Sequence, residues 1–268
     1  MKKRSPRAAD SRIVPGKTLI ESIRTTRKSA RAMGSEFFGV TALSLVAGFV
    51  DTAGFLALFG MFTAHVTGDL ITGAAALTHG IGSGGLARLL MIPVFMVTVA
   101  LAALFLRATS RRGARSLAPL LALMTLVMAA FGAAGWHYAD RLRSVDSWEV
   151  ILVSGLGVSA MGFQNALMRG ALKGFAQTTV MTGNLAQFTI DLIERLFPPK
   201  EGTPKERDEA RQKARARVRK SAFPLLGFMA GAALGAWLTS VYGLLAIAVP
   251  AGILLILTVI TAVRGRQA

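Results

Sequence analysis

The sequence Gly48-Phe-Val-Asp51, followed sixteen residues later by Thr67-Gly-Asp-Leu70, places two carboxylates inside an otherwise apolar region. The same order of residue types returns about 115 positions downstream, as Gly162-Phe-Gln-Asn165 and Thr182-Gly-Asn-Leu185. In this second copy, amides stand where the first copy has carboxylates. The spacing between the two motifs differs by only one residue between the copies, so we predict that the chain consists of two related halves.

The composition is that of a membrane protein. Hydrophobic residues make up 53% of the 268 positions and charged residues 17%, with a mean hydropathy of +0.51. Segments 62–77 and 175–197 are short or polar, so we predict that they are re-entrant or broken rather than fully spanning. The longer apolar runs predict six membrane-spanning helices, at 37–59, 89–106, 117–135, 150–168, 223–242 and 243–263.

Lys and Arg are concentrated in three segments, and cytoplasmic segments of membrane proteins are enriched in these residues. Residues 1–36 carry ten Lys and Arg against three acids, residues 107–116 four against none, and residues 198–220 nine against four. Six crossings place all three segments in the cytoplasm, whereas eight would place 107–116 outside. The nearly neutral segment 137–149 is then external, and Arg88 is the one charge that disagrees.

Three crossings in each half give the two halves opposite orientations, an inverted repeat of the kind common in transporters. We therefore predict an all-α, polytopic protein of the bacterial inner membrane, with an inverted 3+3 repeat and both termini cytoplasmic. The expected parts are a basic N-terminal tail (1–36), a first membrane repeat (37–136), an external loop (137–149), a second membrane repeat (150–263) containing a basic cytoplasmic loop (198–220), and a C-terminal tail (264–268). Within the N-terminal tail, residues 16–33 are either a basic helix on the membrane surface or a solvated segment.

Glycine and proline give further expectations about helix packing. Gly227, Gly231 and Gly235 recur at four-residue intervals, which predicts a helix face that another helix approaches closely. Pro93 and Pro250 are expected to bend their helices.

The candidate site of the first half consists of Asp51, His65, Thr67 and Asp69. A carboxylate such as Asp51 inside an apolar helix is costly unless it faces a polar interior or is held protonated. It therefore either handles a proton or cation, or caps a backbone break near Gly48 or Gly54. Asp69 with Thr67 would begin a short helix facing a bound species, or simply cap that helix. His65 precedes Asp69 by four residues, so a helix would place both on one face as a proton-relay pair, the alternative being an ordinary interior histidine.

The candidate site of the second half consists of Gln164, Asn165, Thr182 and Asn184. An amide can donate and accept hydrogen bonds without titrating. The two halves are thus expected to divide into a charged coupling site and a neutral site that orients the solute. Drift of an ancient repeat is the alternative explanation for the same pattern.

Other chemistries are disfavoured. The chain has no cysteine, and its three histidines are scattered, so we expect no disulfide, metal site or cofactor. The sequence Gly80-Ile-Gly-Ser-Gly-Gly85 fits a dinucleotide fingerprint only formally, because no βαβ unit surrounds it. No nucleophile can be paired with a base, so we expect no enzyme. The basic segments lack interleaved aromatic residues, which argues against nucleic acid as a partner.

The motif pairs resemble those of the YoaK family of bacterial membrane proteins. The resemblance covers about residues 35–263 and includes Gly48-Phe-Val-Asp-Thr-Ala-Gly-Phe-Leu56 and Thr178-Thr-Val-Met-Thr-Gly-Asn184. It implies a multi-pass membrane architecture but no substrate, because the family has no established activity. Asp69 departs from the family pattern, which has Asn at that position, so a role for Asp69 does not follow from the resemblance.

The sequence favours a secondary transporter or channel for an unidentified small solute, with proton coupling as one option. The alternative is a non-transporting scaffold whose basic segments recruit a cytoplasmic partner or anionic lipid headgroups. The expected partners are therefore the lipid bilayer, anionic headgroups and a small solute, with a homo-oligomer left open.

Topology is directly testable because the chain has no native cysteine. Single cysteines at Ser116 and Thr203 should react with an impermeant thiol reagent only from the cytoplasmic side, and one at Ser144 only from outside. Labelling of Ser116 from outside would replace six crossings with eight.

Overall fold

The structure is a computed structural model that describes residues 19–80, 83–109, 117–170, 172, 177–197 and 203–267. The chain divides into two compact units, Met1–Glu36 and Phe37–Ala268. Helix α1 (Leu19–Ala57) begins in the first unit, so the segment expected at 16–33 is helical from residue 19 onward. Residues 1–18 of the predicted tail lie outside the described residues, as do residues 110–116 of the predicted basic segment 107–116.

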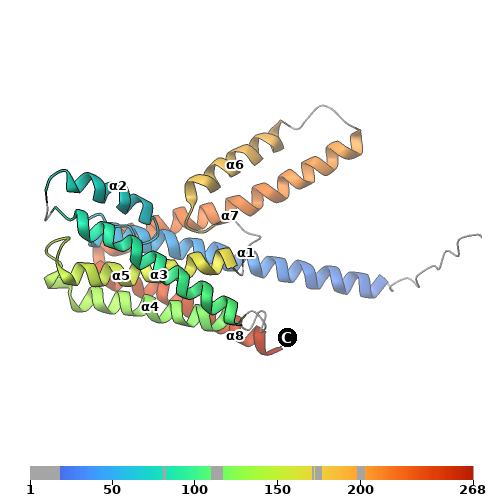
Figure 1. The fold of residues 1–268 in the computed structure, drawn as a ribbon. Coiled ribbons are helices and arrows are strands. Elements are labelled where there is room, and N and C mark those ends of the chain that lie inside the picture. The colour runs from blue at the N-terminus through green and yellow to red at the C-terminus, as the bar shows by residue number, and fades with distance from the viewer. Residues whose placement is uncertain are drawn as a thin grey trace, which may run out of the picture. The chain divides into compact units, whose positions relative to one another are not determined.

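Every regular element among the described residues is a helix (Figure 1). This agrees with the expected all-α class, and it follows from the apolar sequence, since a helix bonds its own backbone polar groups in lipid. After α1 the order is α2 (Val66–Leu77), α3 (Gly85–Thr109), α4 (Leu117–His137), η2 (Ala139–Arg141), α5 (Trp148–Gly170), α6 (Met181–Leu196), α7 (Pro204–Tyr242), η3 (Gly243–Ile247) and α8 (Ala248–Gln267).

Five helical stretches of the described chain are long and apolar enough to cross a membrane. They are Phe37–Ala57, Gly85–Thr109, Leu117–His137, Trp148–Gly170 and Lys205–Arg264. The last contains two helices, α7 and α8, joined at Gly243, whose φ is 58°. Helices α2 and α6 have 12 and 16 residues. At about 1.5 Å per residue, neither matches the roughly 30 Å of a hydrocarbon core.

Helices α1 and α5 form the centre of the second unit. In their most apolar windows, 61% and 72% of the residues are buried, against 17% for α3. The two helices are antiparallel, because Gln164 of α5 bonds the Leu43 carbonyl of α1, whereas Ser154 of α5 contacts Met61 just beyond the end of α1.

Helix α7 packs against α1 through the glycines at four-residue intervals. A methyl group built on Gly227 would lie 2.6 Å from the carbonyl oxygen of Thr41, and one on Gly235 would lie 2.6 Å from that of Phe49. Between them, Gly231 faces the carbonyl oxygen of Leu45 even more closely. Residue numbers rise together on both helices, so α1 and α7 are parallel. The partner of the predicted glycine face is therefore α1.

The other long helices also form one parallel and one antiparallel pair. Helix α3 runs parallel to α5, because Gly162 contacts Thr98 and Gly170 contacts Leu106. Helix α4 runs antiparallel to α8, where Oγ1 of Thr125 and Oγ1 of Thr258 lie 3.2 Å apart while Gly135 contacts Leu244. Thus α3 lies on α5 as α7 lies on α1.

The two halves also agree in where their short helices begin. Helix α2 begins at Val66 and α6 at Met181, so the two starts are separated by the same 115 residues as the Thr-Gly motifs. Each short helix packs against the long helix that follows it, α2 on α3 and α6 on α7.

Two expectations about local structure were wrong. The basic segment expected as a loop over 198–220 is helical from Pro204 onward, because strong helix formers follow a capping box in which Thr203 and Glu206 bond each other's backbone N–H groups. Pro250 does not bend a helix. It lies in the first turn of α8, where its missing N–H removes no helical hydrogen bond.

Replacing Gly231 by alanine should destabilise the protein, because the added methyl group would overlap the Leu45 carbonyl and push α7 from α1. Overpacking of this kind costs about 1–3 kcal/mol. The readout is thermal unfolding of the purified protein in detergent. Gly155→Ala is the matched control, since a methyl group there meets nothing within 4 Å. Equal melting temperatures for the two variants would contradict the α1–α7 contact.

Candidate functional site

The chain between α1 and α2 forms a first helix break, residues 58–65. Phe59 and Gly60 reverse the chain with φ values of 56° and 76°. The backbone then returns to Asp51 of α1, whose Oδ1 accepts hydrogen bonds from the N–H groups of Thr63 at 2.9 Å, Ala64 at 2.7 Å and His65 at 3.3 Å. A buried carboxylate therefore satisfies the amides that lead into α2, at the positive end of that helix dipole.

The other oxygen of Asp51 holds His65. Nδ1 of His65 lies 2.6 Å from Oδ2 of Asp51, so a hydrogen bond joins the two side chains. His65 precedes α2 rather than lying within it. The predicted His65–Asp69 pair on one helical face is therefore not formed, and the histidine pairs with Asp51 instead.

Asp69 binds the same break from the other side. Its Oδ1 accepts the N–H of Phe62 at 3.0 Å, and its side chain is fully buried. Nη1 of Arg88, on α3, lies 3.9 Å from that oxygen and donates to the Gly60 carbonyl at 2.8 Å, while Nη2 donates to the carbonyl of Phe59. Arg88 thus pairs with Asp69 and caps the reversed turn. This accounts for Arg88, the one charge that disagreed with the positive-inside assignment.

A second helix break, residues 177–180, precedes α6 and is held by α5. Nε2 of Gln164 donates to Oγ1 of Thr178 at 2.8 Å and to the Leu43 carbonyl at 2.8 Å. Oδ1 of Asn165 accepts the hydroxyl of Thr179 at 2.8 Å. One glutamine therefore ties the second break to both central helices.

Asn184 repeats the geometry of Asp69 with the opposite polarity. Asp69 accepts from the backbone N–H seven residues earlier, whereas Nδ2 of Asn184 donates to the backbone carbonyl of Gln177, also seven residues earlier. The motif residues of each half therefore fasten that half's own break. The first half uses carboxylates on backbone amides and the second uses amides on hydroxyl and carbonyl groups.

Both breaks contact the central pair, at different levels. Thr63 of the first break packs against Gly157 of α5, seven residues before Gln164. Along a helix this separates the two breaks by about 10 Å. Helices α2 and α6 start from these two levels.

Several buried polar atoms near the breaks have no hydrogen-bond partner within the described part of the chain. Two of them are Gln164 Oε1 on α5 and Ser44 Oγ on α1, and Nε2 of the same glutamine bonds the carbonyl of Leu43, the residue before Ser44. Asp69 Oδ2 and Gln177 Oε1 are also unpartnered there. Such groups are costly to bury dry, so they mark places where water or a polar solute would be stabilised.

Two predicted site residues are not part of either cluster. Thr67 and Thr182 are exposed on the first turns of α2 and α6. Conversely, sequence reasoning missed Arg88, Thr63, Thr178 and Thr179. Arg88 carried a usable signal, an unexplained charge beside an apolar run, and Thr178 and Thr179 begin the stretch that carries the family resemblance.

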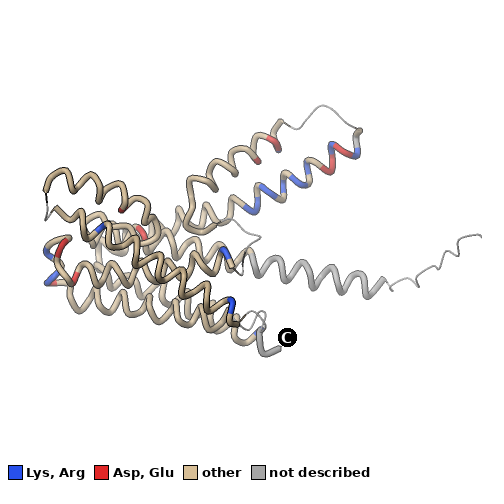
Figure 2. The backbone as a smooth tube through the Cα atoms, in the orientation of Figure 1, with Lys and Arg blue, Asp and Glu red and all other residues tan. Residues whose placement is uncertain are grey.

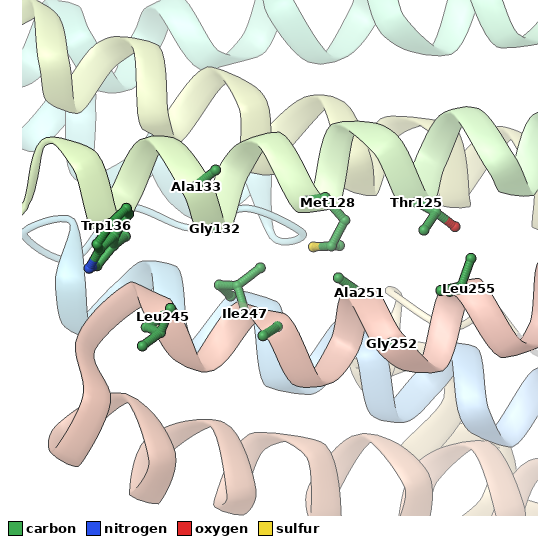
Figure 3. A pocket seen from close by; sticks show the side chains of 12 residues that line it. Thr125, Met128, Gly132, Ala133, Trp136, Leu245, Ile247, Ala251, Gly252 and Leu255 are labelled. Carbon is green, nitrogen blue, oxygen red and sulfur yellow. The ribbon is translucent and has the colours of Figure 1, made fainter.

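Among the described residues, no three His, Asp or Glu side chains are grouped so that they could hold a metal ion. A hollow of about 450 Å³ between α4 and α8 is lined by apolar residues such as Met128, Trp136, Ile247 and Ala251 (Figure 3). Its one hydroxyl, on Thr125, already bonds Leu121 and Thr258, so the hollow does not suit a polar solute.

A family model described as "Protein of unknown function (DUF1275)" matches residues 39–260, which include both breaks. The chain belongs to the DUF1275 family. The YoaK-like proteins belong to DUF1275 as well, so the resemblance seen in the sequence is confirmed. No curated protein and no solved structure matches the chain. As a DUF1275 protein, it is a helical protein with several candidate membrane spans.

Replacing Asp51 by alanine should lower stability, because the N–H groups of Thr63 and Ala64 would lose their acceptor. Each buried donor left unpaired costs about 1–3 kcal/mol. Asp51→Asn keeps one acceptor oxygen and should lose less. Thermal unfolding in detergent measures both, with Ser44→Ala, a buried position on the same helix, as control. If Asp51→Ala melts with Ser44→Ala, the first break does not depend on Asp51.

Proposed function

We propose that this DUF1275 protein is a secondary transporter for a small solute in the bacterial inner membrane. Its halves would be inverted repeats with three crossings each, α1, α3 and α4 against α5, α7 and α8. The antiparallel directions of α1 and α5, and of α4 and α8, support this arrangement. The joining of α7 to α8 at Gly243 supports two crossings within the last apolar stretch.

The charges support the cytoplasmic placement of both termini. Helix α7 is parallel to α1, and Phe223 contacts Phe37 where the apolar part of each helix begins. The basic residues of α7 precede that level (Figure 2), and in the sequence the basic residues of 1–36 precede Phe37. The positive-inside rule therefore assigns both sets to the cytoplasm in the proposed topology.

The observation that carries the proposal is the pair of helix breaks on one central antiparallel pair. Irregular backbone at membrane depth is tolerated where protein or a water-lined cavity satisfies it, and transporter sites are commonly built from such broken helices. In the proposed topology, the first break is reached from outside and the second from the cytoplasm. Two polar atoms without partners among the described residues, Ser44 Oγ and Gln164 Oε1, lie on these helices near the level of the second break.

The two breaks are held by hydrogen bonds of different strength, which supports a proposal about which break opens more easily. The first break is held by a carboxylate that accepts three backbone amides, whereas the second depends on hydrogen bonds between neutral side chains. Hydrogen bonds with an ionised partner are about twice as strong as neutral ones. The second break would therefore open more easily, and protonation of Asp51 would loosen the first. This makes Asp51 a coupling residue that acts by holding the break rather than by touching the solute.

Alternating access can be tested without knowing the solute. Ala64 and Thr179 occupy equivalent positions, 115 residues apart, and both are buried. Single cysteines there should react slowly with an impermeant thiol reagent, Ala64→Cys only from outside and Thr179→Cys only from the cytoplasm. Lowering the external pH should raise the reactivity of the Ala64→Cys protein, because protonation of Asp51 loosens the first break. The reactivity of the Thr179→Cys protein should then fall.

A Ser144→Cys protein is the control for constant external labelling. Simultaneous reactivity of both buried positions from both sides would indicate a channel. Reactivity of both from the same side, or a complete lack of reactivity at either position, would exclude the proposed alternation.

A further inference from the structure

Helix α6 and the first half of α7 form an antiparallel hairpin whose polar contacts face inward. The buried residues of α6 are Met181, Asn184 and Asp191. Oδ1 of Asp191 accepts a hydrogen bond from Nε of Arg217 on α7 at 3.0 Å, and Arg217 also pairs with Glu194. The charged edge of α6 is therefore turned toward α7.

The opposite face of α6 is apolar and exposed. The large apolar side chains of this face are 51–72% exposed, and they are Leu185, Ile190, Ile193, Leu196 and Phe197. At about 100° per residue, Ile193 lies opposite Asn184 and Asp191, and the other four positions lie about 100–140° from them, to either side of Ile193. A helix in water would turn such a face toward its partner. Here the apolar face is left for an apolar environment that the described residues do not supply.

Helix α7 adds a stripe of arginines to the same hairpin. Arg207, Arg211, Arg215 and Arg219 recur every four residues, and all four are exposed. Their successive positions differ by about 40° around the helix, so they form one continuous band. Figure 2 shows this basic half of α7, followed by a long stretch without charged residues. The hairpin therefore combines an exposed apolar face with an exposed cationic band.

The course of α7 identifies the surface that this hairpin meets. The helix continues unbroken from Lys220 into the apolar run that begins at Phe223. Arg219 is four residues from that run and Arg207 sixteen, distances of about 6 and 24 Å along the axis. A leaflet with anionic lipids offers both an acyl boundary about 5–10 Å deep and negative phosphates. Nucleic acid would match only the charge.

We propose that the α6–α7 hairpin docks on the cytoplasmic leaflet, with the apolar face of α6 inserted and the arginine band bound to anionic headgroups. This docking goes beyond solute transport and does not depend on it. It would fasten the helix that follows the second break to the membrane, so lipid charge would set the position of that break.

The test uses the full-length chain, whose lack of cysteine allows a single label. Ile193→Cys is labelled with an environment-sensitive NBD fluorophore and reconstituted at one copy per nanodisc, in phosphatidylcholine alone or with phosphatidylglycerol. Arg195→Cys is the matched control, because two residues further on the side chain points about 200° away. With phosphatidylglycerol, the Ile193 probe should shift to the blue and resist iodide quenching, whereas the Arg195 probe should not.

The arginine band is tested by charge. Each basic residue near an anionic surface changes partitioning roughly fivefold. Replacing Arg207, Arg211, Arg215 and Arg219 by glutamine should therefore weaken the phosphatidylglycerol response at least tenfold, while replacing all four by lysine should retain most of it. Added salt should reverse the response in the parent protein.

Three results would overturn the proposal. One is an Ile193 probe that is quenched equally in both kinds of nanodisc, and another is an equal blue shift in the glutamine variant. The third is a shift that requires two copies per nanodisc, which would assign the apolar face to a second copy of the chain. The parent measurement stands even if the glutamine variant does not fold.

Discussion

The hydrogen bonds from the backbone of Thr63 and Ala64 to Asp51 are the constraint on which the first half depends. Lipid offers no hydrogen bonds, so a chain that leaves α1 and returns must find partners for its free amides inside the protein. A carboxylate satisfies several of them from one position. Its placement on α1 fixes where the break returns, and hence where α2 begins.

Arg88 completes this arrangement from the opposite end of the break. The amides point at Asp51 and the carbonyls of Phe59 and Gly60 point at Arg88, so the irregular segment is held between an anion and a cation. Asp69 lies beside Arg88 and binds the remaining amide of Phe62. Asp51, Asp69 and Arg88 are therefore accounted for by one turn of backbone.

The second half solves the same problem without charge. Gln164, Asn165 and Asn184 contact hydroxyl and carbonyl groups of the second break, and Gln164 reaches across to α1. Glycines permit the close approach of α7 to α1 and of α3 to α5, so each half contributes a helix to the other half's centre. The proposed mechanism follows from this combination of shared packing and unequal fastening.

The sequence by itself determined the membrane character, the position of both unusual segments and the family, and it predicted two related halves. These properties depend on composition, on hydropathy and on motif order, which are written along the chain. The glycine face of α7 was also predictable, but its partner was not.

Only the tertiary structure decided that Asp51 bonds His65 and the returning backbone, that Arg88 belongs to the first break, and that Thr178 and Thr179 anchor the second. Each of these contacts joins residues from separate elements, and their geometry follows from helix packing rather than from local pattern. The basic segment at 204–220 shows the reverse case. A charge count predicted only that it is cytoplasmic, whereas its helical conformation depends on the capping box at Thr203 and its packing on the contact with α6.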